Sequence, residues 1–130
     1  MKARPHTFSK DERLKRQRDF GLVFAEGKAV SDRLLVVHAR PNGLTHNRLG
    51  LAVGKKHGGA VARNRLKRLL REAYRTRKPE LPQGYDIVVV PREGAPGDLQ
   101  LLRGSLDTLL HRIAETFDPS APSPGEDSNP

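Results

Sequence analysis

The residues best suited to chemistry lie between Gly54 and Arg75, in the stretch GKKHGGAVARNRLKRLLREAYR. At about 100° per residue, one helical face of this stretch collects apolar side chains at i, i+3, i+4, i+7 and i+8: Leu66, Leu69, Leu70, Ala73 and Tyr74. The opposite face collects Asn64, Arg68, Arg71 and Arg75, with Arg65 and Lys67 beside them. Like charges at these spacings repel one another, so helix stability does not explain the pattern. A bound polyanion does.

Two interpretations of this basic face are open: a solvated face on a basic protein, or a surface that binds phosphates. Arginine outnumbers lysine on the face, and a planar guanidinium suits phosphate and stacks on bases where an ammonium does not. Glycines at 54, 58 and 59 leave backbone N–H groups approachable just before the helix, where an anion can dock. Both observations favour the phosphate-binding surface.

Length and charge point to one basic domain. A chain of 130 residues accommodates a single domain with a modest core. The formal net charge is +9, and since the last thirteen residues, DPSAPSPGEDSNP, contain three acids and no base, the remainder carries +12. Such a body attracts nucleic acid or another acidic surface. We expect a flexible basic arm over 1–12, an RNA-binding domain over 13–117 and a disordered acidic Pro/Ser-rich tail over 118–130.

The expected compartment is the cytoplasm. The chain has no cysteine, which rules out disulfides, thiol nucleophiles and Cys-based zinc sites. Its amino-terminal stretch, MKARPHTFSKDERLKRQ, lacks an apolar run that could act as a signal sequence or cross a bilayer. No membrane partner is expected.

The hydrophobic pattern predicts an α+β fold in which helices pack on a mixed four-stranded sheet. Helices are expected over Arg16–Glu26, about Ala60–Arg77 and Asp98–Phe117. A short strand near Ala29–Ser31 precedes a strand over Arg33–Arg40, and Arg48–Lys55 is its expected hairpin partner. Tyr85–Val90, YDIVVV, is a continuous apolar run typical of a buried central strand. The predicted order is α-β-β-β-α-β-α.

No arrangement of residues predicts catalysis by the polypeptide alone. The stretch GLAVGKK from Gly50 has three residues between its glycines, whereas the nucleotide-binding loop needs four, and it lacks the Ser or Thr after the lysine. The five histidines have no pair at metal-binding spacing, and no pair of acids lies in an apolar setting. We therefore expect no catalytic residue and no metal ligand in the chain.

Taken in order, these motifs resemble the protein subunit of bacterial ribonuclease P. The specific part is Arg63-Asn64-Arg65 followed by Lys67, Arg68 and Arg71, and preceded by Lys55-Lys56 and Gly58. Further matches are Arg13-Leu14, Asp19-Phe20 with Phe24, Gly27 and Arg33. The resemblance covers roughly Arg13 to Phe117.

The resemblance implies a ribonucleoprotein endonuclease whose large catalytic RNA, with bound Mg²⁺, removes the 5′ leader of precursor tRNA. The protein assists that RNA, and no obligate protein partner is implied. Contacts with the catalytic RNA would come from Lys55, Lys56, Arg63, Asn64, Arg65, Lys67, Arg68 and Arg71. The single-stranded leader would lie in a cleft formed by Arg13, Phe20, Phe24 and His38. The family also implies a left-handed crossover around the basic helix, against the usual rule.

Two other functions remain open from the residues alone. A basic scaffold protein that binds ribosomal or other structured RNA, with no processing role, would have the same electrostatics. A helix-turn-helix DNA-binding protein fits less well, because no second helix precedes the basic one by a short turn. The ordered string around Arg63-Asn64-Arg65 favours ribonuclease P.

Overall fold

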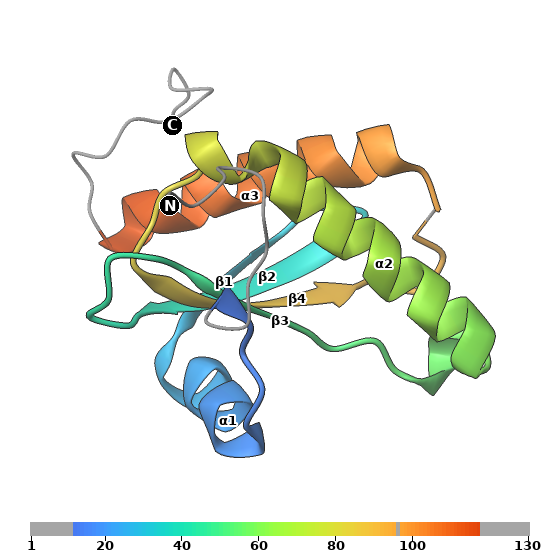
Figure 1. Cartoon of the computed structure of the whole chain (residues 1–130), viewed down its shortest axis with the longest axis horizontal. Helices are drawn as coiled ribbons and strands as arrows, with labels where there is room; N and C mark the ends of the chain where they lie inside the picture. Colours follow the sequence, from blue (N-terminus) through green and yellow to red (C-terminus); the bar gives the residue numbers. More distant parts are fainter. Residues whose placement is uncertain (1–11, 96, 118–130) are drawn as a thin grey trace, which may run out of the picture.

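The computed structural model describes residues 12–95 and 97–117. The tail expected over 118–130 and nearly all of the arm expected over 1–12 therefore lie outside the described residues. Within them, the chain forms the predicted α+β fold in the predicted order (Figure 1). The elements are α1 (Gln17–Glu26), β1 (Lys28–Ser31), β2 (Leu35–Pro41), β3 (Arg48–Leu51), η2 (Lys55–His57), α2 (Ala60–Arg77), η3 (Lys78–Glu80), β4 (Tyr85–Pro91) and α3 (Leu99–Phe117).

The sheet has the strand order β1-β2-β4-β3. Strand β2 pairs antiparallel with β1 and with β4, whereas β3 pairs parallel with β4. The predicted hairpin between Arg33–Arg40 and Arg48–Lys55 is therefore wrong, because β4 lies between these two segments. The physical reason is that Ile87, Val88 and Val89 of β4 are all buried, so this strand needs a neighbour on each side and cover on both faces.

The parallel pairing makes the link from β3 to β4 a crossover connection. Strand β3 ends at Leu51 rather than Lys55, and the chain continues through η2 into α2 before it returns as β4. Parallel neighbours require such a crossover. The left-handed sense implied by the family stays a prediction.

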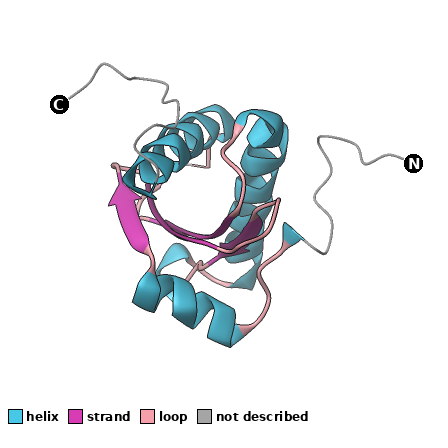
Figure 2. Cartoon of the chain, turned by 90° about the vertical axis from the view of Figure 1, so that its left-hand side faces the viewer, coloured by secondary structure: helices cyan, strands magenta, loops and turns pink. Residues whose placement is uncertain are grey.

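The two faces of the sheet are covered differently. Helices α2 and α3 lie together on one face and α1 lies on the other (Figures 1 and 2). Side chains alternate along β2, so Leu35, Val37 and Ala39 join the large core under α2 and α3. On the opposite face Val88 of β4 packs with Val23 of α1 in a smaller core. Strand β4 contributes to both cores, since its Ile87 and Val89 join the large one.

Helix α1 ends at Gly27, as the sequence predicted. The Gly27 N–H donates to the Val23 carbonyl at 2.9 Å, and the chain then turns into β1. A Cβ at this position would lie 2.5 Å from the carbonyl oxygens of both Val23 and Ala39. These are backbone atoms of α1 and β2, so neither moves away easily. Glycine is required because the helix end touches the sheet.

We expect Gly27→Ala to lower the free energy of unfolding by about 1 to 3 kcal/mol through this overpacking. Gly21→Ala is the matched control, because Gly21 lies inside the same helix with nothing within 4 Å of its added Cβ. That control should gain up to about 1 kcal/mol from helix propensity. Urea unfolding of both variants measures the difference, and equal stabilities would contradict the close approach at Gly27.

Candidate nucleic-acid interface

Helix α2 buries the apolar face that the sequence predicted. Leu66, Leu70, Ala73 and Tyr74 are buried and Leu69 is half-buried, whereas Asn64, Arg65 and Arg68 are exposed. Burial raises the pKa of Tyr74 to about 12, so its phenol stays neutral at physiological pH. The helix is therefore fixed to the core along one side and presents its basic side outward.

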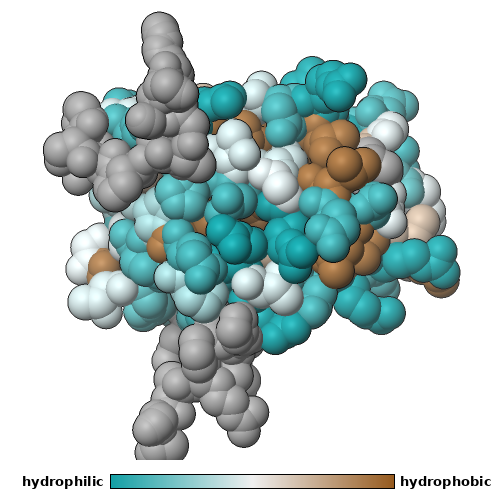
Figure 3. Space-filling view, turned by 90° about the horizontal axis from the view of Figure 1, so that it is seen from above, coloured by the Kyte–Doolittle hydropathy of each residue, from teal (hydrophilic) through white to brown (hydrophobic). Residues whose placement is uncertain are grey.

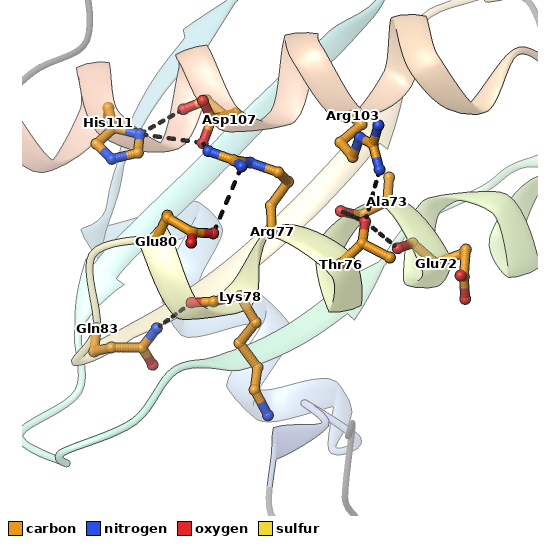
Figure 4. Close-up of polar contacts among 10 residues, drawn as sticks. All are labelled: Glu72, Ala73, Thr76, Arg77, Lys78, Glu80, Gln83, Arg103, Asp107 and His111. Atoms are coloured by element: carbon orange, nitrogen blue, oxygen red, sulfur yellow. Dashed lines mark hydrogen bonds and ion pairs between the residues drawn. The ribbon is translucent and has the colours of Figure 1, made fainter. Parts of the chain in front are cut away.

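The carboxyl-terminal part of α2 uses its basic residues for internal ion pairs. Arg75 pairs with Glu72 at 2.6 Å, and Lys78 in η3 pairs with Glu12 at 2.6 Å. Arg77 reaches Asp107 of α3 at 3.2 Å and Glu80 at 3.5 Å (Figure 4). The pairs of Arg77 and Lys78 tie α2 and η3 to neighbouring segments, whereas the Arg75–Glu72 pair lies within α2. These ion pairs account for the three cations without any ligand.

The amino-terminal part of α2 and the preceding turn have no such partners. Within residues 12–95 and 97–117, no ion pair is formed by Lys55, Lys56, Arg63, Arg65, Lys67, Arg68 or Arg71. Burial, together with the neighbouring charges of Arg13 and Arg68, lowers the pKa of Arg71. The cations are therefore close enough to repel one another. These seven residues, over 55–71, form a positive surface without acidic partners in the described part of the chain.

The outer face of α2 and α3 is mainly hydrophilic, with some hydrophobic groups gathered between polar ones (Figure 3). The large hydrophobic residues most exposed on these helices are Val61, at 72%, and Leu101, at 52%. Val61 lies in the first turn of α2, next to the positive surface. Its methyl groups offer an apolar contact beside the cations.

A hollow of about 340 Å³ lies between α1, β3 and α2; we call it the Phe20 hollow. Its lining is Arg13, Leu14, Lys15, Phe20, Leu49, Gly50, Leu51, Lys67 and Arg71. The two sets of residues predicted for different RNA contacts meet here, since Lys67 and Arg71 of α2 join Arg13 and Phe20. The Phe20 ring lies against Gly50, where a Cβ would be 2.5 Å from the ring. Because Gly50 of β3 has no side chain, the Phe20 ring can pack directly against the strand.

The rings of Phe24 and His38 lie in edge-to-face contact outside this hollow. Their centroids are 4.7 Å apart with an interplanar angle of 72°. His38, Val88 and Gly50 are register partners across β2, β4 and β3, so they form one row on the sheet face that α1 covers. Phe24 is 45% exposed at one end of this row, and Phe20 lies over its other end. Burial lowers the pKa of His38, which keeps the imidazole neutral near pH 7.

One buried charge pair was missed by sequence reasoning. Asp86 of β4 is 1% exposed and accepts two hydrogen bonds from Arg48 of β3, Nε to Oδ1 at 2.8 Å and Nη2 to Oδ2 at 2.6 Å. These hydrogen bonds raise the pKa of Arg48, so the guanidinium is permanently charged. The available signal was an acid inside the apolar run YDIVVV, because such an acid needs a partner.

Comparison with protein-family models gives a match over residues 8–114 to the family described as Ribonuclease P. The chain belongs to the ribonuclease P protein family. The match spans every element from α1 to the last turns of α3. It decides between the functions that the sequence left open, in favour of ribonuclease P over a structural RNA scaffold or a DNA-binding protein.

Relatives within this family cover most of the chain. The ribonuclease P protein component of Thermotoga maritima is 45% identical over 112 residues, which are 82% of this chain and 96% of that protein. That of Caldanaerobacter subterraneus subsp. tengcongensis is 44% identical over 77% of this chain and 87% of its own length. Among solved structures, the Thermotoga maritima protein superposes with a TM-score of 0.73 at 44% identity, covering 78% of this chain and 97% of that one. The Staphylococcus aureus protein gives 0.70 at 34% identity, covering 82% and 98%.

As a member of this family, the chain is the protein component of an endoribonuclease holoenzyme that processes tRNA. No helix in the part of the chain that the structure describes is long and apolar enough to cross a bilayer.

Some cations of α2 form ion pairs with described acids and others do not, so RNA binding can be compared between two variants that lose the same charge. Arg65→Ala with Arg68→Ala should weaken binding of the ribonuclease P RNA and reduce the slope of log affinity against log salt by roughly 0.7 to 0.9 per lost phosphate contact. Stability should change by less than about 0.5 kcal/mol, since both side chains are exposed and neither forms an ion pair with another described residue.

Arg75→Ala with Arg77→Ala is the control of equal charge. Loss of their ion pairs should cost about 0 to 1 kcal/mol of stability per pair, with a smaller change in the salt slope. Filter binding over a salt series and thermal unfolding measure both quantities. Indistinguishable salt slopes for the two double variants would contradict a binding surface confined to the cations over 55–71.

Proposed function

We propose that this protein binds two RNA segments at once, the catalytic RNA through α2 and the 5′ leader of precursor tRNA through the face that carries α1. The observation that carries the proposal is the Phe20 hollow, where Lys67 and Arg71 of the basic helix line the same space as Phe20 and Arg13. One continuous surface thus links the two proposed contacts. A leader held there would lie beside the RNA that cleaves it.

The contact with the catalytic RNA is assigned to Lys55, Lys56, Arg63, Asn64, Arg65 and Arg68, with Lys67 and Arg71 at its border with the leader. A folded RNA presents a rigid pattern of phosphates, and a helix fixed to the core presents guanidinium groups in an equally rigid pattern. The uncompensated charge of these residues supports this assignment, because nothing in the described protein neutralises it.

The contact with the leader is assigned to Phe20, Phe24, His38 and Arg13. Single-stranded RNA is bound by ring faces that stack on bases and by cations that follow the backbone. Phe24 is exposed enough to offer a ring surface, and His38 supports that ring from the sheet. Phe20 packs partly against the smaller core, so it combines structural and binding roles. Arg13 would supply the positive charge.

We propose that the Mg²⁺ of the reaction is bound mainly by the catalytic RNA. We also propose that the protein acts in the cytoplasm and has no obligate protein partner. Bound Mg²⁺ supplies a Lewis acid and an activated water for phosphodiester cleavage. Within residues 12–95 and 97–117, no three His, Asp or Glu side chains gather closely enough to hold a metal. The proposed part of the described residues is to hold and orient RNA.

The isolated protein is expected to leave precursor tRNA uncut in the presence of Mg²⁺. With the cognate catalytic RNA at low Mg²⁺, the same protein should accelerate removal of the leader. Gel analysis of the products tests both statements. Correct 5′ maturation by protein freed of RNA would overturn the assignment of catalysis to the RNA.

Phe24→Ala with His38→Ala should weaken binding of precursor tRNA to the holoenzyme by tenfold or more, since each stacked base contributes about 1 to 3 kcal/mol. Binding of mature tRNA should not change, because it lacks the leader. Phe20→Ala is the informative comparison, because its ring also packs on the smaller core and its loss should lower thermal stability as well. Equal losses for precursor and mature tRNA would show that these rings do not touch the leader.

The same site should respond to pH. Burial keeps the pKa of His38 below 6.5, so the free protein holds it neutral at pH 7. Leader phosphates favour the protonated ring, so binding of precursor should tighten as pH falls below about 6.5. His38→Phe keeps a ring and removes the titration, and it should flatten this part of the pH profile. If His38→Phe left the pH dependence of precursor binding unchanged, that dependence would come from another titratable group.

A further inference from the structure

A second hollow, which we call the Arg48 pocket, lies next to the Phe20 hollow at the start of α1. It is lined by Arg13, Lys15, Arg16, Asp19, Leu44, His46 and Arg48. Four of these seven side chains are Arg or Lys, and Asp19 is the one acid among the described residues that line it. Arg13 and Lys15 also line the Phe20 hollow, so the two hollows are neighbours that share these side chains.

Buried Asp86 holds Arg48 in place at the wall of this pocket. Two hydrogen bonds fix the Nε and Nη2 edge of the guanidinium on a carboxylate that is 1% exposed. The Arg48 side chain itself is 30% exposed, which leaves its outer edge open to the pocket. A buried ion pair adds little net stability compared with apolar residues of similar size. Orientation of Arg48 is therefore the more direct explanation for a carboxylate in the central strand.

The same carboxylate also organises the loop that closes the pocket. Asn42 donates from Nδ2 to Asp86 Oδ1 at 3.0 Å and to the His46 carbonyl at 3.2 Å. The Asn42 Oδ1 accepts from the Leu44 N–H at 2.8 Å. Leu44 and His46 are the loop residues that line the pocket. Asp86 thus holds Arg48 directly and, through Asn42, the loop that supplies Leu44 and His46.

The chemistry of the lining selects an anion rather than a base or an apolar group. Apart from Leu44, the side chains that line the pocket are polar or charged, and the only ring among them is the imidazole of His46. The N-cap residue of α1, Arg16, makes no side-chain cap, and the acid in the first turn of that helix is Asp19, so the cations outnumber the acid at this helix end. Guanidinium groups held at fixed positions match the oxygens of a phosphate.

We propose that the Arg48 pocket binds a backbone phosphate of RNA, with Asp86 as the positioning residue for Arg48. The proposal rests on the proposed function for the identity of the RNAs. Because the pocket shares Arg13 and Lys15 with the Phe20 hollow, the favoured source is the leader strand beyond the bases held near Phe20. A phosphate of the catalytic RNA is the second source with the same chemistry.

The test uses the full-length protein assembled with its catalytic RNA. Lys15→Gln with Arg16→Gln removes two exposed cations of the pocket, and Arg48→Lys keeps the charge of Arg48 but loses the paired hydrogen bonds to Asp86. Asp86→Asn tests the positioning role. Arg40→Gln is the matched control, because Arg40 is the other register neighbour of Asp86, pairs with Glu26 of α1 and does not line the pocket.

Affinity is measured across a salt series for the catalytic RNA, for mature tRNA, and for precursors whose leaders are shortened one nucleotide at a time. If the phosphate belongs to the leader, the Lys15/Arg16 variant should lose about tenfold in affinity and about 0.7 in salt slope per lost contact, only for leaders long enough to reach the pocket. If it belongs to the catalytic RNA, assembly should weaken instead, equally for every substrate. Either result supports phosphate binding at the Arg48 pocket and identifies the RNA that supplies the phosphate.

Asp86→Asn should reproduce the loss seen with Arg48→Lys, and no further loss should follow when the two are combined. Thermal unfolding of each variant is measured in parallel. If Arg48→Lys or Asp86→Asn fails to fold, the Lys15/Arg16 variant still tests phosphate binding at the pocket. Affinities and salt slopes equal to those of Arg40→Gln in every arm would overturn the proposal. A wild-type holoenzyme that bound precursor and mature tRNA equally would instead count against the proposed leader contact, and the arm with the catalytic RNA would still test the pocket.

Discussion

The architecture depends on burial of β4 on both of its faces. An apolar strand of this kind is stable only with a neighbour at each edge and cover above and below, so β2 and β3 must flank it. Since β3 runs parallel to it, the chain has to cross over one face, and α2 is the segment that crosses. This connection places the basic helix on the face opposite α1. Both proposed RNA contacts follow from the position of one strand.

Charge pairing then divides the long basic helix by function. Near its carboxyl end, Arg75 and Arg77 pair with Glu72, Glu80 and Asp107, and the pair with Asp107 joins α2 to α3. Near its amino end, cations meet one another, and the neighbouring charges of Arg13 and Arg68 lower the pKa of Arg71. Composition alone does not make this distinction. It depends on which acids the fold brings within reach.

Periodicity in the sequence was sufficient for the elements and insufficient for their pairing. The helices and strands appear where apolar spacing and glycine predicted them, and Gly27 ends α1 as expected. The β2–β3 hairpin was wrong because a short loop suggests pairing, whereas the sheet order follows from the burial that β4 requires. The Arg48–Asp86 pair was missed because its residues are 38 positions apart in the chain. The meeting of Lys67 with Phe20 likewise depends on the crossover, which no local pattern encodes.

The crowded cations on α2 also link folding to assembly. Their mutual repulsion is a cost borne by the free protein, and a bound polyanion removes it. The folding equilibrium and the RNA-binding equilibrium are then coupled, since any ligand that binds only the folded state stabilises it by mass action. A substitution in the core far from any RNA, such as one at Leu106, would lower the folded fraction and with it the apparent affinity. The protein is expected to reach its full stability only inside the ribonucleoprotein particle.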